Sequence, residues 1–193
     1  MKSSNKIGAL IFCLLGVFTL MSIIGDYNVT VLSTSINDAN ENYEEKELNV
    51  TFEKDKENNQ VIVEAYDVEK FENITIDNTT VFDYEITFNN RNSKVDYTFY
   101  IENNSSNDAI LQDYELPNPV CKGFHDECEK YLQGLTYRLM YESGAPLVGG
   151  DVIKAHSRVK VILSLEYKVN EKLLPSSTVD ITNLGFDLAF KAK

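Results

Sequence analysis

Two cysteines flank a histidine and two acidic residues in the segment VCKGFHDEC, residues 120–128. Thiolate, imidazole and carboxylate groups all bind metal ions, so Cys121, His125, Glu127 and Cys128 could hold zinc or copper. The spacing between the cysteines matches no standard zinc pattern such as C-x2-C. A close pair of cysteines in an exported protein usually forms a local disulfide instead. We therefore predict a Cys121–Cys128 disulfide and no metal site, although a reducing compartment would shift the balance towards metal.

Other patterns that carry chemistry are missing from the sequence. No HExxH, GxSxG, Walker or GxGxxG pattern occurs, and His125 and His156 are the only histidines. A nucleophile–base couple would depend on one of these two, and neither stands in a supporting signature. Acidic residues are plentiful, but nothing in their spacing singles out a catalytic pair. We therefore predict a protein without catalytic residues or cofactor, which is not an enzyme.

The N-terminal segment from Ile7 to Ile24 is apolar and carries no charge, and it follows Lys2 and Lys6. As a helix it would extend roughly 27 Å, close to the hydrocarbon thickness of a bilayer. The apolar region of a cleaved signal is usually about 7–15 residues long, and no A-x-A cleavage site follows this one. We expect residues 1–25 to be a retained signal anchor, with a cleaved signal peptide as the alternative. Either way the rest of the chain faces the exterior, at the cell membrane or secreted.

The chain is acidic, with a formal net charge of -12. Residues 1–25 contain two lysines and no acid, so the remainder stands at -14. Such a surface repels phosphate backbones and anionic lipid headgroups, so nucleic-acid binding is excluded. The acidity favours solubility, and divalent-cation binding is the alternative. We predict that residues 26–46 form an acidic polar spacer and that residues 47–193 form a single domain.

From residue 48 onwards, apolar and polar residues alternate with a period of two, which indicates half-buried strands. The apolar members of these series are Leu48, Val50, Phe52; Val61, Val63, Ala65; Phe82, Tyr84, Ile86, Phe88; Val95, Tyr97, Phe99, Ile101; Leu135, Tyr137, Leu139, Tyr141; Val159, Val161, Leu163, Leu165, Tyr167; and Val179, Ile181, Leu184, Phe186, Leu188, Phe190. Roughly seven or eight strands with polar turns predict an all-β fold. We expect an immunoglobulin-like or jelly-roll-like antiparallel β-sandwich after an N-terminal hydrophobic helix.

The turns suggest how these strands connect. The polar run NNRNSK predicts a hairpin between residues 82–88 and 95–101, and KDKENN predicts a hairpin or a long strand pair between residues 48–52 and 61–65. In the last strand the alternation slips by one residue near Asn183, which suggests a β-bulge. One short helix is expected around residues 125–132. We assign the aromatic alternation to the core.

Three segments resemble a known plan: DYTFYIENNSSNDAILQDYELP, LTYRLMYESGAPLVGGDVIKAHSRVKVILSLEYK and LLPSSTVDITNLGFDLAF. They are similar to small exported surface and biofilm-matrix proteins of Gram-positive bacteria, of the TasA/camelysin type, over about Val81 to Phe190. This resemblance implies a sandwich released by cleavage and assembled into fibres by strand exchange. The chain departs from the plan in its VCKGFHDEC insertion and long anchor. It also lacks the HExxH that a camelysin-like protease activity would need.

Two hypotheses for the function follow. The first is a non-enzymatic bacterial cell-surface or matrix structural protein that assembles through strand pairing, with self-association as its main contact besides the membrane. The second is a ligand-binding or adhesin module that recognises a surface protein or glycan through the Cys121–Cys128 loop. The chain is rich in Asn, Lys, Ile and Glu, a bias common in AT-rich bacterial genomes. Its Asn-x-Ser/Thr sequons are therefore read as chance occurrences.

Overall fold

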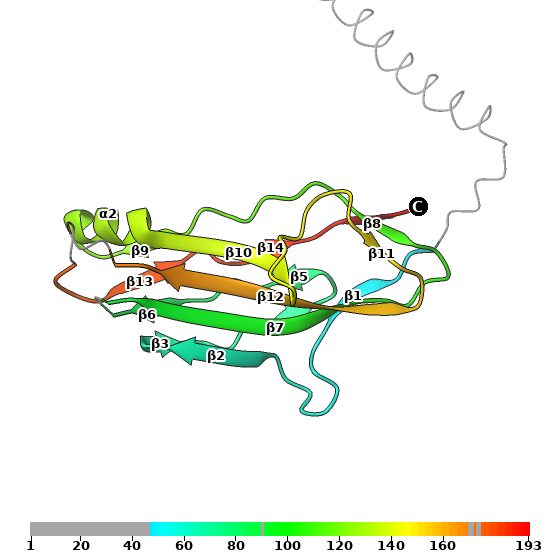
Figure 1. The fold of residues 1–193 in the computed structure, drawn as a ribbon, viewed down its shortest axis with the longest axis horizontal. Helices are drawn as coiled ribbons and strands as arrows, with labels where there is room; N and C mark the ends of the chain where they lie inside the picture. Colours follow the sequence, from blue (N-terminus) through cyan, green and yellow to red (C-terminus); the bar gives the residue numbers. More distant parts are fainter. Residues whose placement is uncertain (1–46, 90, 170–171, 173–174) are drawn as a thin grey trace, which may run out of the picture. The chain divides into compact units, whose positions relative to one another are not determined.

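A computed structural model of the chain describes residues 47–89, 91–169, 172 and 175–193 (Figure 1). The expected signal anchor and the spacer up to residue 46 lie outside the described residues. The described part is built from antiparallel strands and one short helix, α2 (His125–Gly134), which confirms the all-β prediction and the expected helix. Among these described residues, no helix has the length and apolar character needed to cross a membrane.

The largest sheet is organised around two long central strands (Figure 1). β7 (Ser93–Asn103) and β12 (Ser157–Tyr167) pair antiparallel along their whole length. β10 (Leu135–Tyr141) pairs with the other side of β12 and forms one edge of the sheet. β1 (Val50–Glu53) and β2 (Ile62–Tyr66) both pair with β7 and share the opposite edge. The two central strands match the sequence prediction because their inward side chains alternate without interruption.

The hairpin expected between the first two strands does not form. β1 and β2 both run antiparallel to β7, so they point in the same direction and lie end to end along its edge. The residues between them form a local turn, in which the Asp55 amide donates to the Gln60 carbonyl at 3.0 Å. The prediction of a hairpin was wrong because alternation reports which face of a strand is buried and does not identify its partner.

Three smaller sheets complete the described part. The first contains β3 (Val68–Phe71), β6 (Ile86–Phe88), β13 (Val179–Thr182) and β9 (Val120–Lys122), in that order. The second contains β14 (Phe186–Asp187), β5 (Thr80–Val81) and β4 (Ile76–Asp77), and the third contains β11 (Val152–Ile153), β8 (Ala109–Leu111) and β15 (Phe190–Ala192). The described strands are therefore more numerous and shorter than expected.

The hairpin expected between β6 and β7 is also wrong, because the two strands lie in different sheets. β6 pairs with β3 and β13, whereas β7 pairs with β12, β1 and β2. Phe88 and Val95 are both fully buried, so the chain crosses from one sheet to the other and each strand covers the same core. A polar connection of this length serves a hairpin or a crossing equally well, and the sequence signal does not separate them.

The C-terminal segment is divided into β13, β14 and β15, which belong to three different sheets. Asn183 adopts a left-handed backbone conformation with φ of 61° at the end of β13. Asparagine tolerates this conformation better than most residues, and it redirects the chain. The expected β-bulge is therefore a break between strands. Leu184, Phe186 and Leu188 are nevertheless buried on one side, as the slipped alternation predicted.

Aromatic rings join the sheets into one core, as expected for the alternating aromatic residues. The ring centroid of Phe52 lies 5.0 Å from that of Phe99 and 6.3 Å from that of Phe186. The Tyr97 ring lies 5.3 Å from Tyr84, and its buried hydroxyl donates to the Glu72 carbonyl at 2.6 Å. The large sheet thus contacts the smaller sheets through apolar surface while its buried hydroxyls are hydrogen-bonded.

Candidate functional site

The Cys121–Cys128 disulfide joins β9 to α2, in agreement with the pairing expected from the sequence. Cys121 lies in β9, which pairs with β13, and Cys128 lies on the buried face of α2. Closing such a short loop limits the unfolded chain only modestly, which stabilises the fold by about 2 kcal/mol. The main effect of the bond is to hold the start of α2 against the edge of the neighbouring sheet.

The Glu127 carboxylate is a second attachment between α2 and the rest of the fold. It accepts hydrogen bonds from the Lys130 ammonium at 2.8 Å and from the Ser176 amide at 2.6 Å. These two contacts, the Lys130 contact first, lower the pKa of Glu127 from 4.5 to about 2. Tyr131 lies on the same helix, and its hydroxyl donates to the Ser177 carbonyl at 2.8 Å. Glu127 therefore stabilises the position of α2 against the chain around Ser176.

The metal cluster considered from the sequence does not assemble. Both sulfurs are joined to each other, so Cys121 and Cys128 offer no thiolate ligand. His125 is solvent-exposed, 3.4 Å from Glu129, while Glu127 is buried and bound to Lys130. In the described ranges, no group of three or more His, Cys, Asp or Glu residues could hold a metal ion.

Substitution of Glu127 tests its structural role. In the folded protein its pKa lies below the ordinary value of 4.5, so its contribution is fully present above pH 4.5 and is lost as the pH falls towards 2. We expect Glu127→Gln to be less stable than the parent chain at pH 7 and to approach it near pH 2. Urea unfolding at pH 7, 4 and 2.5 measures this convergence. Glu129→Gln, at an exposed position on the same helix, is the control and should change little at any pH. A pH-independent effect of Glu127→Gln would contradict the assignment.

An apolar group lies exposed around this braced helix. Phe124, at the N-cap of α2, has 82% of its surface exposed, and Leu132, two helical turns further on, has 43% exposed. Val120 on β9 is half exposed. Two exposed acids, Asp126 and Glu129, lie on the same helix. We refer to these five residues as the α2 tip. A large aromatic side chain with this exposure on a disulfide-braced element is a candidate contact residue.

The α2 tip lies at one end of the described part, and the chain enters it at the other (Figure 1). In the large sheet, Leu135 follows α2 and pairs with Tyr167 at the end of β12. The start of β12 pairs with Asn103, which in turn pairs with Val50 near the first described residues. The length of the central strands therefore separates the α2 tip from the point where the domain begins.

β10 is a free edge of the large sheet over part of its length. On the side away from β12, the Tyr141 amide donates to the Ala145 carbonyl at 2.8 Å, and the Leu139 carbonyl accepts from the Leu147 amide at 3.1 Å. Because backbone groups alternate along an antiparallel strand, the N–H and C=O of Tyr137 point to the same side. No strand of the described part pairs with β10 on this side. The first half of β10 is therefore an open edge that another segment can join.

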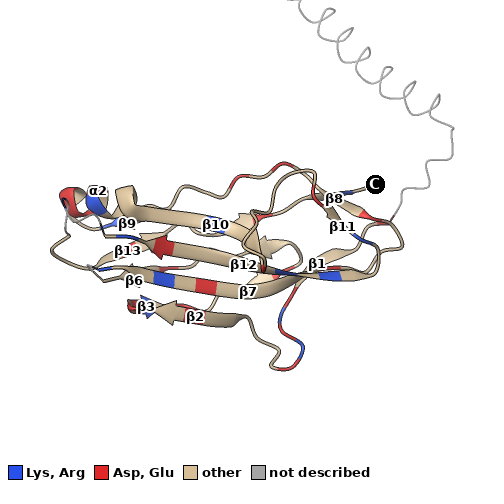
Figure 2. Ribbon diagram, viewed as in Figure 1, with Lys and Arg blue, Asp and Glu red and all other residues tan. Residues whose placement is uncertain are grey.

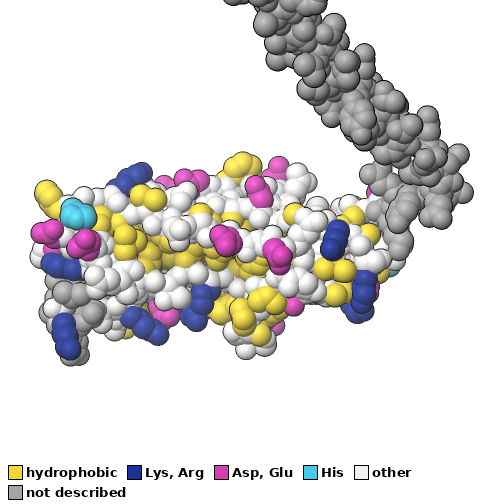
Figure 3. All heavy atoms as spheres, turned by 90° about the horizontal axis from the view of Figure 1, so that it is seen from above, with side chains coloured by type: hydrophobic (Ala, Val, Ile, Leu, Met, Phe, Trp, Pro, Cys, Tyr) yellow, Lys and Arg dark blue, Asp and Glu magenta, His cyan; other side chains and the backbone are white. Residues whose placement is uncertain are grey.

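An apolar groove of about 520 Å³ runs beside β10, and we call it the β10 groove. Its apolar lining includes Tyr114, Leu116, Leu139, Met140, Pro146 and Val148. The Tyr114 hydroxyl donates to the Leu147 carbonyl at 2.6 Å, which holds the two sides of the groove together. Arg138 also lines it, and none of the described residues that line it is acidic. Figure 3 shows hydrophobic side chains gathered in a band along this face of the domain.

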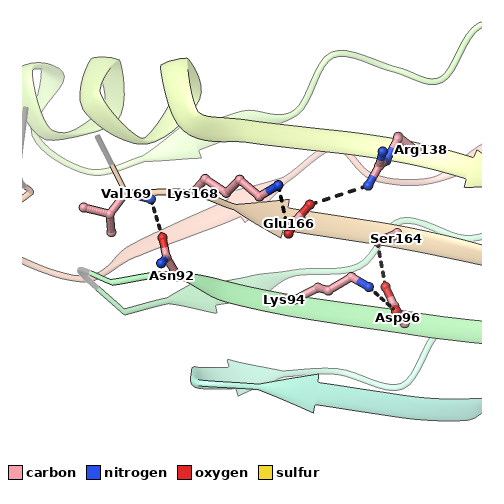
Figure 4. Close-up of polar contacts among 8 residues, drawn as sticks. All are labelled: Asn92, Lys94, Asp96, Arg138, Ser164, Glu166, Lys168 and Val169. Carbon is pink, nitrogen blue, oxygen red and sulfur yellow. Dashed lines mark hydrogen bonds and ion pairs between the residues drawn. The ribbon is translucent and has the colours of Figure 1, made fainter. Parts of the chain in front are cut away.

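The large sheet carries charged residues along its central strands β7 and β12, which Figure 2 marks in blue and red. Asp96 accepts from Lys94 and Ser164, each at 2.6 Å, in the middle of the sheet (Figure 4). Glu166 lies 3.5 Å from both Arg138 and Lys168 (Figure 4). These pairs form a solvated, ion-paired surface, which we interpret as a contribution to solubility.

One buried tyrosine, Tyr84, and one half-buried tyrosine, Tyr137, line the interior behind β10. The Tyr84 hydroxyl is 3.4 Å from that of Tyr137, which donates to the Leu184 carbonyl. Burial raises the pKa of Tyr84 and of Tyr137 well above the ordinary value of 10.0. Both hydroxyls therefore stay protonated at neutral pH and serve as hydrogen-bond donors inside the core.

No protein-family model matches the chain, and comparisons with the curated proteins and with the solved structures give no match either. The function is therefore argued from the geometry alone. Sequence reasoning pointed to the Cys121–Cys128 loop but missed Phe124 as its exposed residue and missed the β10 groove. The signal for Phe124 was its place directly before α2, at the N-cap of the helix. The groove joins distant segments, and no local pattern reports it.

Proposed function

We propose that this chain is a non-enzymatic bacterial cell-surface or extracellular-matrix structural protein that self-associates through β10. The observation that carries the proposal is the open first half of this edge strand beside an apolar groove. An unpaired strand edge is a ready template for another chain, since each free N–H and C=O gains a partner on association.

The charge of the edge strands supports the choice of β10. β10, LTYRLMY, carries one charge in seven residues, whereas β3, VEKF, carries two in four. β2, at the far edge of the large sheet, places Glu64 among exposed residues. Charged residues on an edge strand oppose strand addition, so β3 and β2 are protected and β10 is not.

The finer architecture and location belong to the same proposal. We propose that the large sheet and the smaller sheets form an immunoglobulin-like or jelly-roll-like sandwich, similar in plan to the TasA/camelysin-type proteins. Aromatic contacts such as Phe52–Phe186 between the large sheet and a smaller one support this interpretation. We further propose that residues 7–24 hold the protein at the outer face of a cell membrane, or direct its secretion if they are cleaved. The Cys121–Cys128 disulfide is compatible with an oxidising exterior.

A charge placed on β10 tests the proposed edge. Thr136 is exposed on this strand, and Thr136→Lys should weaken self-association by at least about tenfold, because a lysine on an edge strand opposes pairing. The measurement is sedimentation velocity of the full-length chain over a wide range of protein concentrations. Thr75→Lys is the matched control, since it makes the same charge change at an exposed position outside β10.

The sedimentation of the two variants and of the parent chain distinguishes three cases. Loss of association in Thr136→Lys but not in Thr75→Lys supports the β10 edge. Equal behaviour of the two variants assigns association to another surface, such as the N-terminal segment, which both carry. A parent chain that stays monomeric at every concentration contradicts the structural-module proposal.

The exposed Phe124 favours a second candidate function, a ligand-binding or adhesin module that uses the α2 tip. The disulfide and Glu127 hold this helix in place, and it lies at the end of the domain away from the chain entry. A large exposed aromatic on a rigid element is typical of recognition residues. We expect glycan and protein arrays probed with the full-length chain to show binding that Phe124→Ala abolishes. Arrays without a bound partner would remove this candidate.

A further inference from the structure

We infer that the occupant of the β10 groove is the α2 tip of a second copy of this chain, with the Phe124 ring as the inserted group. This inference rests on the proposed function, and it adds a second contact between copies, in the groove beside the open half of β10. It joins an exposed apolar side chain at one end of the domain to an apolar groove on its side. Two different surfaces of one molecule are then complementary.

The β10 groove and the Phe124 side chain match in size and in apolar character. The β10 groove, at about 520 Å³, lies in the size range of roughly 300–1,000 Å³ typical of binding pockets. Its lining of Leu139, Met140, Pro146 and Val148 offers aliphatic and thioether surface to an aromatic ring. Phe124 is the most exposed large hydrophobic side chain of the described residues, so its burial in such a groove removes apolar area from water on both partners.

The charges beside the β10 groove and on the α2 tip are complementary. Arg138 lies at the groove, half exposed, and its partner Glu166 is shared with Lys168 at the same distance of 3.5 Å (Figure 4). The guanidinium therefore keeps unused donors for a further carboxylate. The α2 tip brings Asp126 and Glu129 close to Phe124 in sequence. The opposite charges of Arg138 and of these two acids favour this docking. Two α2 tips carry like charges, which disfavours contact between them.

The contact is head-to-tail because the α2 tip and the β10 groove are distinct surfaces. Each copy that offers its α2 tip to a neighbour keeps its own groove free for the next copy. A heterologous interface of this kind closes into a ring or continues as a filament. The inference therefore predicts association that proceeds beyond a dimer as the concentration rises.

Photo-crosslinking of the full-length chain tests the contact. Phe124 is replaced by p-benzoyl-phenylalanine, and the protein is mixed as ¹⁵N-labelled and unlabelled copies before irradiation. We expect cross-links between labelled and unlabelled peptides, from position 124 to the segment that contains Met140 and Val148. The same replacement of Phe82, whose side chain is 48% exposed, is the control and should not label the groove.

A charge exchange supplies the second measurement. Arg138→Glu should lower the yield of this cross-link about tenfold, and combining it with Asp126→Lys and Glu129→Lys should restore it. Cross-links confined to one copy, or equal labelling of the groove from position 82, would overturn the inference. Association with cross-links outside the groove would overturn it too, while leaving a self-associating module in place. A chain that does not associate at all overturns both the inference and the proposed function.

Discussion

Replacement of Phe99 by alanine is expected to destabilise the domain by about 3–5 kcal/mol, as is usual for removal of a buried aromatic ring. Phe99 lies in the middle of β7, is fully buried and contacts the Phe52 ring at 5.0 Å. The central position leaves little freedom for neighbouring side chains to fill the cavity. Since small domains have about 5–15 kcal/mol of stability in total, this change removes a large fraction of it.

Chemical denaturation of the full-length chain, followed by near-UV circular dichroism, measures the loss. Tyr66→Ala is the matched control, because this aromatic residue of β2 is 69% exposed and its removal should cost less than about 0.5 kcal/mol. Similar losses for Phe99→Ala and Tyr66→Ala would contradict the assignment of the core to the inner face of the large sheet.

Gly134→Ala is expected to be the second large effect, about 3 kcal/mol, with displacement of α2. Gly134 ends α2 directly before β10, and a Cβ there would lie 2.2 Å from the Lys168 carbonyl oxygen and 2.9 Å from the Tyr167 ring. The first contact is with backbone, which cannot move aside as a flexible side chain can. The Lys168 amide also donates to the Gly134 carbonyl at 2.9 Å, so relief of the clash would break this bond.

Thermal unfolding of Gly134→Ala compared with Gln133→Ala separates the clash from a general effect of substitution in α2. Gln133 is exposed, and alanine favours helix at this position, so its replacement should change stability by less than about 0.5 kcal/mol. If both variants unfold like the parent chain, the close packing of α2 against the end of β12 is not present in solution.

The fold class was predictable from local patterns, but the connections between strands were not. The alternation at Val161, Leu163 and Leu165 identified β12 and its buried face, because the side-chain period of a strand is a local property. The choice of partner depends on the whole layer arrangement. That is why β6 and β7 share a core without pairing, and why the left-handed Asn183 separates strands that the sequence pattern joined.

The candidate site was predictable in part for the same reason. Cys121 and Cys128 are near in sequence, so their spacing indicated the disulfide that joins β9 to α2. The β10 groove brings Leu116 together with Met140 and Val148, which are separated along the chain. Assembly of such a groove follows from tertiary packing, and no spacing rule predicts it.

Hydrogen exchange at the Tyr137 amide tests the central claim most directly. This N–H points away from β12 along the open half of β10, so it should exchange quickly in the dilute full-length chain. We predict that its exchange slows as the protein concentration rises, in step with association measured on the same samples. The Ile162 amide, within the central strand β12, serves as the internal reference and should stay protected throughout. Association without any change in exchange at Tyr137 would contradict self-association through the β10 edge.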